Sequence, residues 1–212
     1  MKKTTSRLSL LKHSRAPSLG LALCALVWSM GAQAQTGNPN RMSSGTSMYG
    51  LGSSYVGLNA GRSNFSLNNG LGGFSADKRA NAYNLYGGGY FNDNLGVELG
   101  YADFGRISRA GGTTRAQGFN VSLVGKMPVA SSFNLLGRLG TTYGRTDVTA
   151  SPASGVATGR ENGFGVSYGL GAEYLFNPTL SGVLQYDEYR LKFAGAGRER
   201  VNTTSLGLRY RF

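Results

Sequence analysis

Residues 205–212, SLGLRYRF, alternate strictly between large apolar side chains and small or charged ones. Successive side chains of an extended chain point to opposite sides, so Leu206, Leu208, Tyr210 and Phe212 share one face of a strand. The other face carries a serine, a glycine and two arginines. A strand with one oily face needs either a protein core or lipid on that side, and the rest of the chain has to show which.

Alternating segments of this kind recur along the chain, and no window from residue 54 onward has apolar residues at helical spacing. The eight predicted strands are 54–65, 81–91, 95–106, 115–127, 133–147, 160–176, 179–193 and 201–212. Tight turns are predicted at 92–94, 128–132 and 177–178, and longer polar loops near 66–80, 107–114, 148–159 and 194–200. Short turns at one end and long loops at the other, with an even number of strands of about ten residues, are typical of an outer-membrane barrel.

The charges within these segments fall on one face only. Glu98, Lys126, Arg138 and Glu173 lie on the polar face of their strands, whereas the apolar faces are almost free of charge. A soluble sheet would turn its charges to water and its apolar face to a core, so here the apolar face is expected to meet lipid. We therefore predict an all-β fold, an eight-stranded antiparallel up-and-down transmembrane β-barrel with no unpaired edge. The sequence leaves the facing of strand 81–91 open.

The N-terminal region predicts an exported protein. A basic stretch without acids is followed by the apolar run LGLALCALVWSM and then by GAQA, the pattern of a secretory signal peptide. We expect cleavage after Ala34, a flexible leader over residues 35–53 and the barrel over 54–212. A membrane-spanning helix is the alternative, but an apolar run of about twelve residues is shorter than the about 20 that a bilayer requires.

Removal of residues 1–34 takes away five basic residues and no acid, which lowers the formal charge from +12 to +7. The same step removes the only cysteine, Cys24, and the only histidine, His13. No thiolate metal site and no histidine base then remain. Asp187 and Glu188 are adjacent, so a regular strand would point them to opposite faces. We therefore expect no enzyme and no catalytic, metal or cofactor site, and the scattered basic residues argue against nucleic-acid binding.

Five segments, in order along nearly all of 54–212, resemble the transmembrane domain of the outer membrane protein A family. They are LGVELGYADFGR (95–106), RAQGFNVSLVGK (115–126), LLGRLG (135–140), GAEYLFNPTL (171–180) and SLGLRYRF (205–212). Gly207, Tyr210 and Phe212 also resemble the C-terminal signal of the outer-membrane assembly machinery. The resemblance implies a location in the outer membrane of a Gram-negative cell, with that machinery and the membrane lipid as partners. Because the chain ends at Phe212, we expect no peptidoglycan-binding domain.

In that family, inward charged residues form a salt-bridge network that plugs or gates the barrel. Glu98, Lys126, Arg138 and Glu173 match its positions, whereas Val183 stands where the family carries an inward arginine. The resemblance therefore implies a structural barrel, a contributor to membrane integrity, with a plugged or poorly conducting lumen. A small porin-like channel is the alternative.

A second alternative is a surface adhesin or lipopolysaccharide-binding protein that acts through its loops. The basic residues expected to contact lipopolysaccharide phosphates are Lys78, Arg79, Arg106, Arg109, Arg160, Arg198 and Arg200. Arginine suits this role because its planar guanidinium binds phosphate oxygens in pairs. A solvated basic rim without a ligand is the plainer interpretation of the same residues. The sequence leaves the oligomeric state open, and we favour a monomer.

Overall fold

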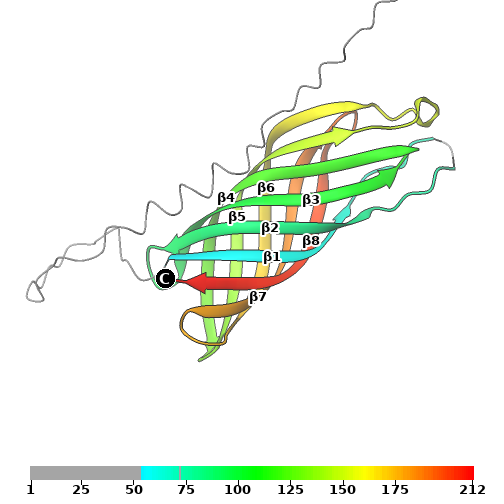
Figure 1. Ribbon diagram of the computed structural model, residues 1–212. Helices are drawn as coiled ribbons and strands as arrows, with labels where there is room; N and C mark the ends of the chain where they lie inside the picture. Colours follow the sequence, from blue (N-terminus) through cyan, green and yellow to red (C-terminus); the bar gives the residue numbers. More distant parts are fainter. Residues whose placement is uncertain (1–53, 72) are drawn as a thin grey trace, which may run out of the picture. The chain divides into compact units, whose positions relative to one another are not determined.

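The computed structural model describes residues 54–71 and 73–212, so the predicted signal peptide and leader lie outside the described residues. The strands are β1 (Ser54–Phe65), β2 (Arg79–Tyr90), β3 (Leu95–Arg109), β4 (Gly112–Ala130), β5 (Phe133–Val148), β6 (Gly159–Leu175), β7 (Leu180–Phe193) and β8 (Gly197–Arg211). Each strand pairs antiparallel with the next, and β8 pairs with β1, which closes the barrel (Figure 1). The predicted fold is confirmed. None of the helical segments described is long and apolar enough to span a membrane.

The two ends of the barrel differ in their connections. The C-terminus lies at the end that carries the turns from β2 to β3, from β4 to β5 and from β6 to β7 (Figure 1). The opposite end carries the longer connections 66–78 and 149–158, the second of which contains a turn of 3-10 helix. Short turns face the periplasm and long loops the cell exterior in barrels of this class, which orients the chain.

The alternation along each strand has the predicted direction. The outward side chains of Leu170 and Leu206 are 72% and 65% exposed, whereas Glu98 and Glu173 are fully buried inside. The facing of β2, which the sequence left open, is settled by its burial, because Ala82, Tyr86 and Tyr90 are buried whereas Tyr83 and Leu85 are exposed. The apolar outer surface is therefore the side that meets lipid.

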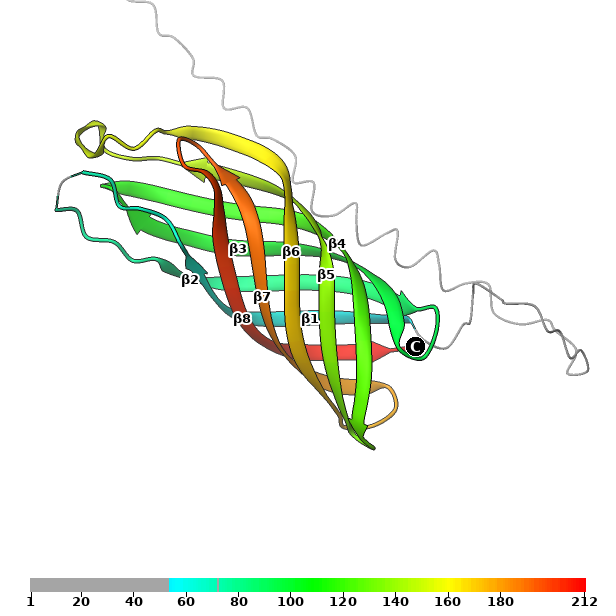
Figure 2. The ribbon, with the colours of Figure 1, turned by 180° about the vertical axis from the view of Figure 1, so that it is seen from behind.

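Two of the four predicted long loops are wrong. Residues 107–109 continue β3 and 112–114 begin β4, so that only Ala110 and Gly111, both with positive φ, make the turn. In the same way, 197–200 belong to β8. The outward side chains at these strand ends are polar because they lie above the membrane. The alternation of apolar and polar residues that identifies a strand in lipid is therefore missing from this part of the sequence. Strands β5 to β8 run side by side on the face seen in Figure 2.

Candidate functional site

The centre of the lumen holds an ion pair between β3 and β5. Arg138 Nη2 lies 2.7 Å from Glu98 Oε1, and Arg138 Nη1 lies 3.5 Å from Asp187 Oδ1 on β7. The hydroxyl of Tyr55 donates a hydrogen bond of 2.9 Å to the second oxygen of Glu98. All three charged side chains are at most 5% exposed. A pair this deeply buried is strengthened by the low local dielectric, and removing one partner leaves the other without compensation.

Arg209 on β8 connects this pair to a second carboxylate. Its guanidinium lies 3.7 Å from Glu98 and 3.3 Å from Glu173, and the side chain is fully buried. The same guanidinium stacks over the rings of Tyr55 and Tyr86, with 4.2 Å and 5.4 Å to the ring centroids. Tyrosine rings attract a desolvated cation electrostatically, so they offset part of the cost of burying this arginine.

Glu173 forms the periplasmic side of the network. Its Oε1 lies 2.6 Å from Arg211 Nη2 and accepts a hydrogen bond of 2.8 Å from the Ser181 hydroxyl. The Asn134 side-chain amide donates a hydrogen bond of 2.9 Å to the other carboxylate oxygen of Glu173. In all, the charged layer contains three acids and three arginines: Glu98, Glu173, Asp187, Arg138, Arg209 and Arg211. The two signs balance, as a dry lumen requires.

The four residues predicted for the network do not all enter it. Glu98 and Arg138 form an ion pair with each other, and Glu173 joins them through Arg209 rather than directly. The expected pairing of Lys126 is wrong for the residues that the structure describes, because its ammonium lies over the Tyr90 ring at 4.6 Å and makes no ion pair there. Lys126 stands near the periplasmic turns, where it is only partly buried.

Arg209 and Asp187 were absent from the predicted network, although the sequence carried a signal for the first. Arg209 lies on the polar face of the alternating segment 205–212. From β8 it provides the inward positive charge that the family carries at the position of Val183 on β7. Val183 is buried opposite Gly207, one inward position from Arg209. Asp187 points into the lumen and Glu188 the other way, as their adjacency predicted, but no pattern in the sequence places Asp187 beside Arg138.

A polar layer lies above the charges. Asn59 donates its amide to Gln185, and its own carbonyl oxygen accepts from the Tyr86 hydroxyl. On the other side of the lumen, the Asn120 amide donates a hydrogen bond of 2.8 Å to the Thr142 hydroxyl on β5. It also donates a hydrogen bond to the hydroxyl of a serine on β6. These bonds satisfy amides that burial would otherwise penalise.

An apolar cluster fills the extracellular half of the lumen. Its members lie on the upper parts of the strands and include Phe65, Phe104, Ile107, Val148, Tyr189, Leu191, Phe193 and Val201, all at most 2% exposed. The rings of Phe104 and Tyr189 meet edge to face at 4.7 Å, and those of Phe65 and Phe193 at 6.2 Å. The sequence prediction assigned no role to these residues, because it considered only the charged residues of the inward faces and placed Ile107 and Val148 in loops.

The predicted lipopolysaccharide contacts occupy two environments. Six are exposed near the extracellular end: Lys78, Arg79, Arg106, Arg160, Arg198 and Arg200. Arg109 is wrong as a surface contact, because it points into the barrel with 3% exposure and donates to the Thr114 hydroxyl and to the Asn68 carbonyl.

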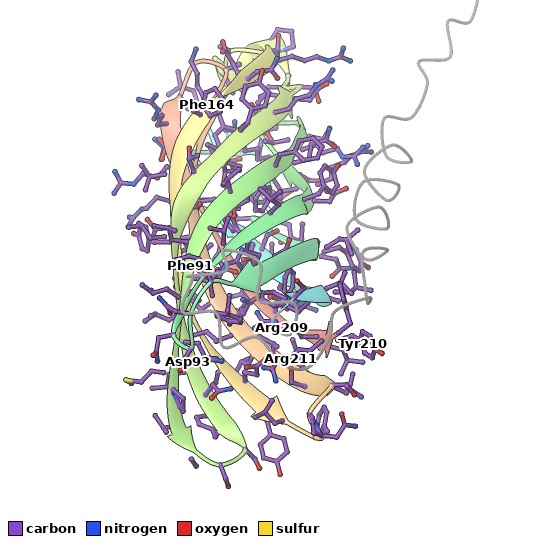
Figure 3. All side chains as sticks on the ribbon, turned by 90° about the vertical axis from the view of Figure 1, so that its left-hand side faces the viewer. Phe91, Asp93, Phe164, Arg209, Tyr210 and Arg211 are labelled. Carbon is purple, nitrogen blue, oxygen red and sulfur yellow. The ribbon has the colours of Figure 1, made fainter. Side chains whose placement is uncertain are left out.

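The residues of the predicted assembly signal lie at the periplasmic end of β8. Tyr210 and Phe212 are 52% and 56% exposed and face outward with stacked rings 6.4 Å apart. In Figure 3, Tyr210 projects from the barrel wall, whereas Arg209 lies within its outline. Gly207 faces inward, where a Cβ atom would approach the Leu58 carbonyl oxygen to 2.1 Å. Close packing of β8 on β1 is thus sufficient to require this glycine.

The described part of the chain offers no group of three or more His, Cys, Asp or Glu side chains that could hold a metal ion. The lumen acids are instead paired with arginines and tyrosines. Chemically, this arrangement can stabilise charge and exclude water, and it presents no activated nucleophile.

Known proteins resemble this chain in sequence and in fold. Outer membrane protein P5 of Haemophilus influenzae is 32% identical over 155 residues, which are 62% of this chain and 42% of P5. Outer membrane protein A of Yersinia pseudotuberculosis is 30% identical over 131 residues, 57% of this chain and 37% of that protein. The chain thus spans about two fifths of the length of these curated relatives.

Among solved structures, Neisserial surface protein A superposes with a TM-score of 0.56 at 14% identity, over 75% of this chain and 97% of that one. Ail, the attachment invasion locus protein of Yersinia pestis, superposes with a TM-score of 0.53 at 20% identity, over 76% and 99%. At these identities the likeness shows the fold alone. Residues 21–212 match the family described as the outer membrane protein beta-barrel domain. The chain belongs to this family, as an outer-membrane protein with a barrel like that of outer membrane protein A.

Proposed function

We propose that this protein is a structural component of the outer membrane whose lumen does not conduct. The observation that carries the proposal is the filling of the lumen by two different layers, one charged and one apolar. The charged layer is the ion-pair network of Glu98, Glu173, Asp187, Arg138, Arg209 and Arg211. An eight-stranded barrel is only just wide enough for its own side chains, so a single layer across it already blocks passage.

The apolar layer makes the closure stronger than an ion-pair network alone. A gate built from ion pairs opens when its partners exchange, because water can then follow the separated charges. Here, water that passed the charges would meet Phe104, Leu191 and Phe193, whose side chains offer no hydrogen bonds. Hydrophobic constrictions in narrow pores exclude water, so they close the path even when no side chain blocks it completely.

A vesicle-swelling assay tests this proposal. The chain is refolded into phosphatidylcholine vesicles, which are then transferred into an isosmotic solution of a small sugar. We expect the same swelling rate as for vesicles without protein, and a known open porin at the same protein-to-lipid ratio serves as the positive control. Swelling above the protein-free rate would favour the porin-like alternative.

A role in binding at the cell surface is the second candidate. Arg198 and Arg200 support it, because both side chains are exposed at the extracellular end and neither forms an ion pair within the residues described. Binding of whole cells to surfaces coated with sulfated polysaccharide tests it. The variant carries both Arg198→Gln and Arg200→Gln. If cells with this variant bind as well as cells with the wild-type protein, this role is excluded for the hairpin formed by β7 and β8.

A further inference from the structure

An aromatic row crosses the outer wall of four neighbouring strands. Tyr101, Phe119, Tyr143 and Phe164 are aligned by the strand register from β3 to β6. Their rings are in contact at 5.1 Å between the first two and 4.9 Å between the last two. Figure 3 places Phe164 at the opposite end of the barrel from Tyr210. Aromatic girdles mark the boundary between hydrocarbon and headgroups, so this row marks the outer boundary.

The next outward positions toward the cell exterior are polar. Gln117 on β4 is aligned with Arg145 on β5, and one step further Arg115 is aligned with Asp147. Two residues along a strand tilted by about 40° correspond to a height of about 5 Å. The headgroup region is about 5–8 Å thick on each side of the membrane. Arg145 therefore lies at headgroup height on the outer wall of the barrel.

The positive charge of this part of the wall is only partly neutralised. Four arginines face outward there, Arg106, Arg115, Arg145 and Arg160, against two aspartates. Arg115 pairs with Asp103 at 2.9 Å, and Arg160 pairs with Asp147 at 2.7 Å. Neither Arg106 nor Arg145 has an ion pair with any residue that the structure describes.

Two of these four arginines line a hollow in the wall. A shallow cleft of about 160 Å³ is lined by Arg115, Gln117, Arg145 and Asp147. The Gln117 carbonyl oxygen accepts a hydrogen bond of 3.2 Å from the Tyr101 hydroxyl, which leaves the amide nitrogen to donate. Two guanidinium groups and one amide therefore line the same cleft, and several such donors suit a group with several acceptor oxygens.

We propose that Arg115, Gln117 and Arg145 bind a phosphate group of a phosphorylated glycolipid in the outer leaflet. The cleft lies at the height of the lipid headgroups, just outside the aromatic row. The ligand is therefore inferred to be a membrane lipid, which presents its anionic group at that height and beside the strand wall. The guanidinium geometry selects phosphate, whose oxygens accept paired hydrogen bonds. This site lies on the strand wall and is independent of whether the lumen conducts.

Native mass spectrometry of the full chain, refolded in detergent and titrated with diphosphorylated lipid A, tests the proposal. Arg145→Gln is the main variant, because Arg145 makes no ion pair within the described residues and its loss should leave folding intact. We expect an apparent affinity about tenfold weaker, the loss of one charge-assisted contact. Arg145→Lys keeps the charge but loses the planar fork, and we expect a smaller loss. The matched control is Arg62→Gln, which removes the same charge from an exposed position of β1 outside the cleft and should bind as the wild type does.

Three results would overturn the proposal. The first is equal weakening by Arg62→Gln, which would show a diffuse charge effect. The second is equal binding of lipid A without its phosphates, and the third is equal binding of phosphatidylglycerol, which would show a preference for any anionic lipid. Far-UV circular dichroism of each variant checks folding, and Arg145→Lys carries the test if Arg145→Gln does not fold.

Discussion

Replacement of Arg138 by methionine should be among the most damaging single changes in the lumen. The guanidinium lies 2.7 Å from Glu98 and 3.5 Å from Asp187, and only 4% of the arginine side chain is exposed. After the change, Glu98 keeps its contacts with Tyr55 and Arg209. Asp187 keeps no ion pair within the described residues. An uncompensated buried charge costs about 3–5 kcal/mol, so we expect the free energy of unfolding to fall by about that amount.

A second substitution in the same chain separates two effects of Arg138→Met, which are the loss of the ion-pair partner of Asp187 and the change in packing. Asp187→Asn removes the carboxylate that Arg138→Met leaves unpaired, so the double variant should be more stable than Arg138→Met alone. We expect a coupling free energy of about 1–3 kcal/mol, the range for residues in direct contact. Asp187→Asn by itself should cost less than Arg138→Met, because Arg138 still pairs with Glu98.

Urea unfolding in phosphatidylcholine vesicles, followed by far-UV circular dichroism, measures all four proteins of this cycle. The reasoning is refuted if Arg138→Met unfolds at the same urea concentration as the wild type. That result would mean that Glu98 and Asp187 are hydrated, that the lumen is wet, and that the ion pairs do not form a barrier.

Three further measurements, two of them on variants, probe the rest of the chain. Intact mass of the exported protein should show cleavage after Ala34 and a mature N-terminus at Gln35, and a retained N-terminal methionine would contradict this. Replacing Tyr210 and Phe212 with serine should reduce outer-membrane levels in cell fractions more than it reduces refolding into detergent, whereas normal levels would show that the ending is only a strand. Lys126→Met should lower the free energy of unfolding by no more than about 1 kcal/mol, the value of a partly exposed cation–π contact, and a loss of 3 kcal/mol or more in urea unfolding would indicate an ion pair.

The fold could be predicted because lipid imposes a strict rule on the sequence. Most outward residues within the membrane are apolar, so a pattern such as that of 164–176 predicts both the strand and its facing. The rule fails above the membrane, where Ser108 and Thr113 face water, and there the sequence was misinterpreted as loop. It also fails in β2, whose inward Tyr86 and Tyr90 are as apolar in appearance as its outward residues.

The lumen site could be predicted only in part. An inward charge such as Glu98 is conspicuous in a barrel strand, but which charge meets which depends on the stagger between strands. Arg209 reaches Glu98 because β8 closes on β1 and brings Tyr55 between them. That closure joins residues far apart in the chain, so spacing along the sequence carries no trace of it. The apolar cluster was missed for a related reason, since its members come from all around the upper rim.

Closure of the lumen by two independent layers is tested most directly by planar-bilayer conductance of four proteins. They are the wild type, a charge-layer variant with Arg138→Met and Asp187→Asn, an apolar-layer variant with Leu191→Ser and Phe193→Ser, and the combination of both. We expect no stable current steps from the wild type or from either single-layer variant, and resolved steps only when both layers are altered. Stable steps from the wild type would contradict the closed lumen, and steps from the charge-layer variant alone would show that the apolar cluster is no barrier.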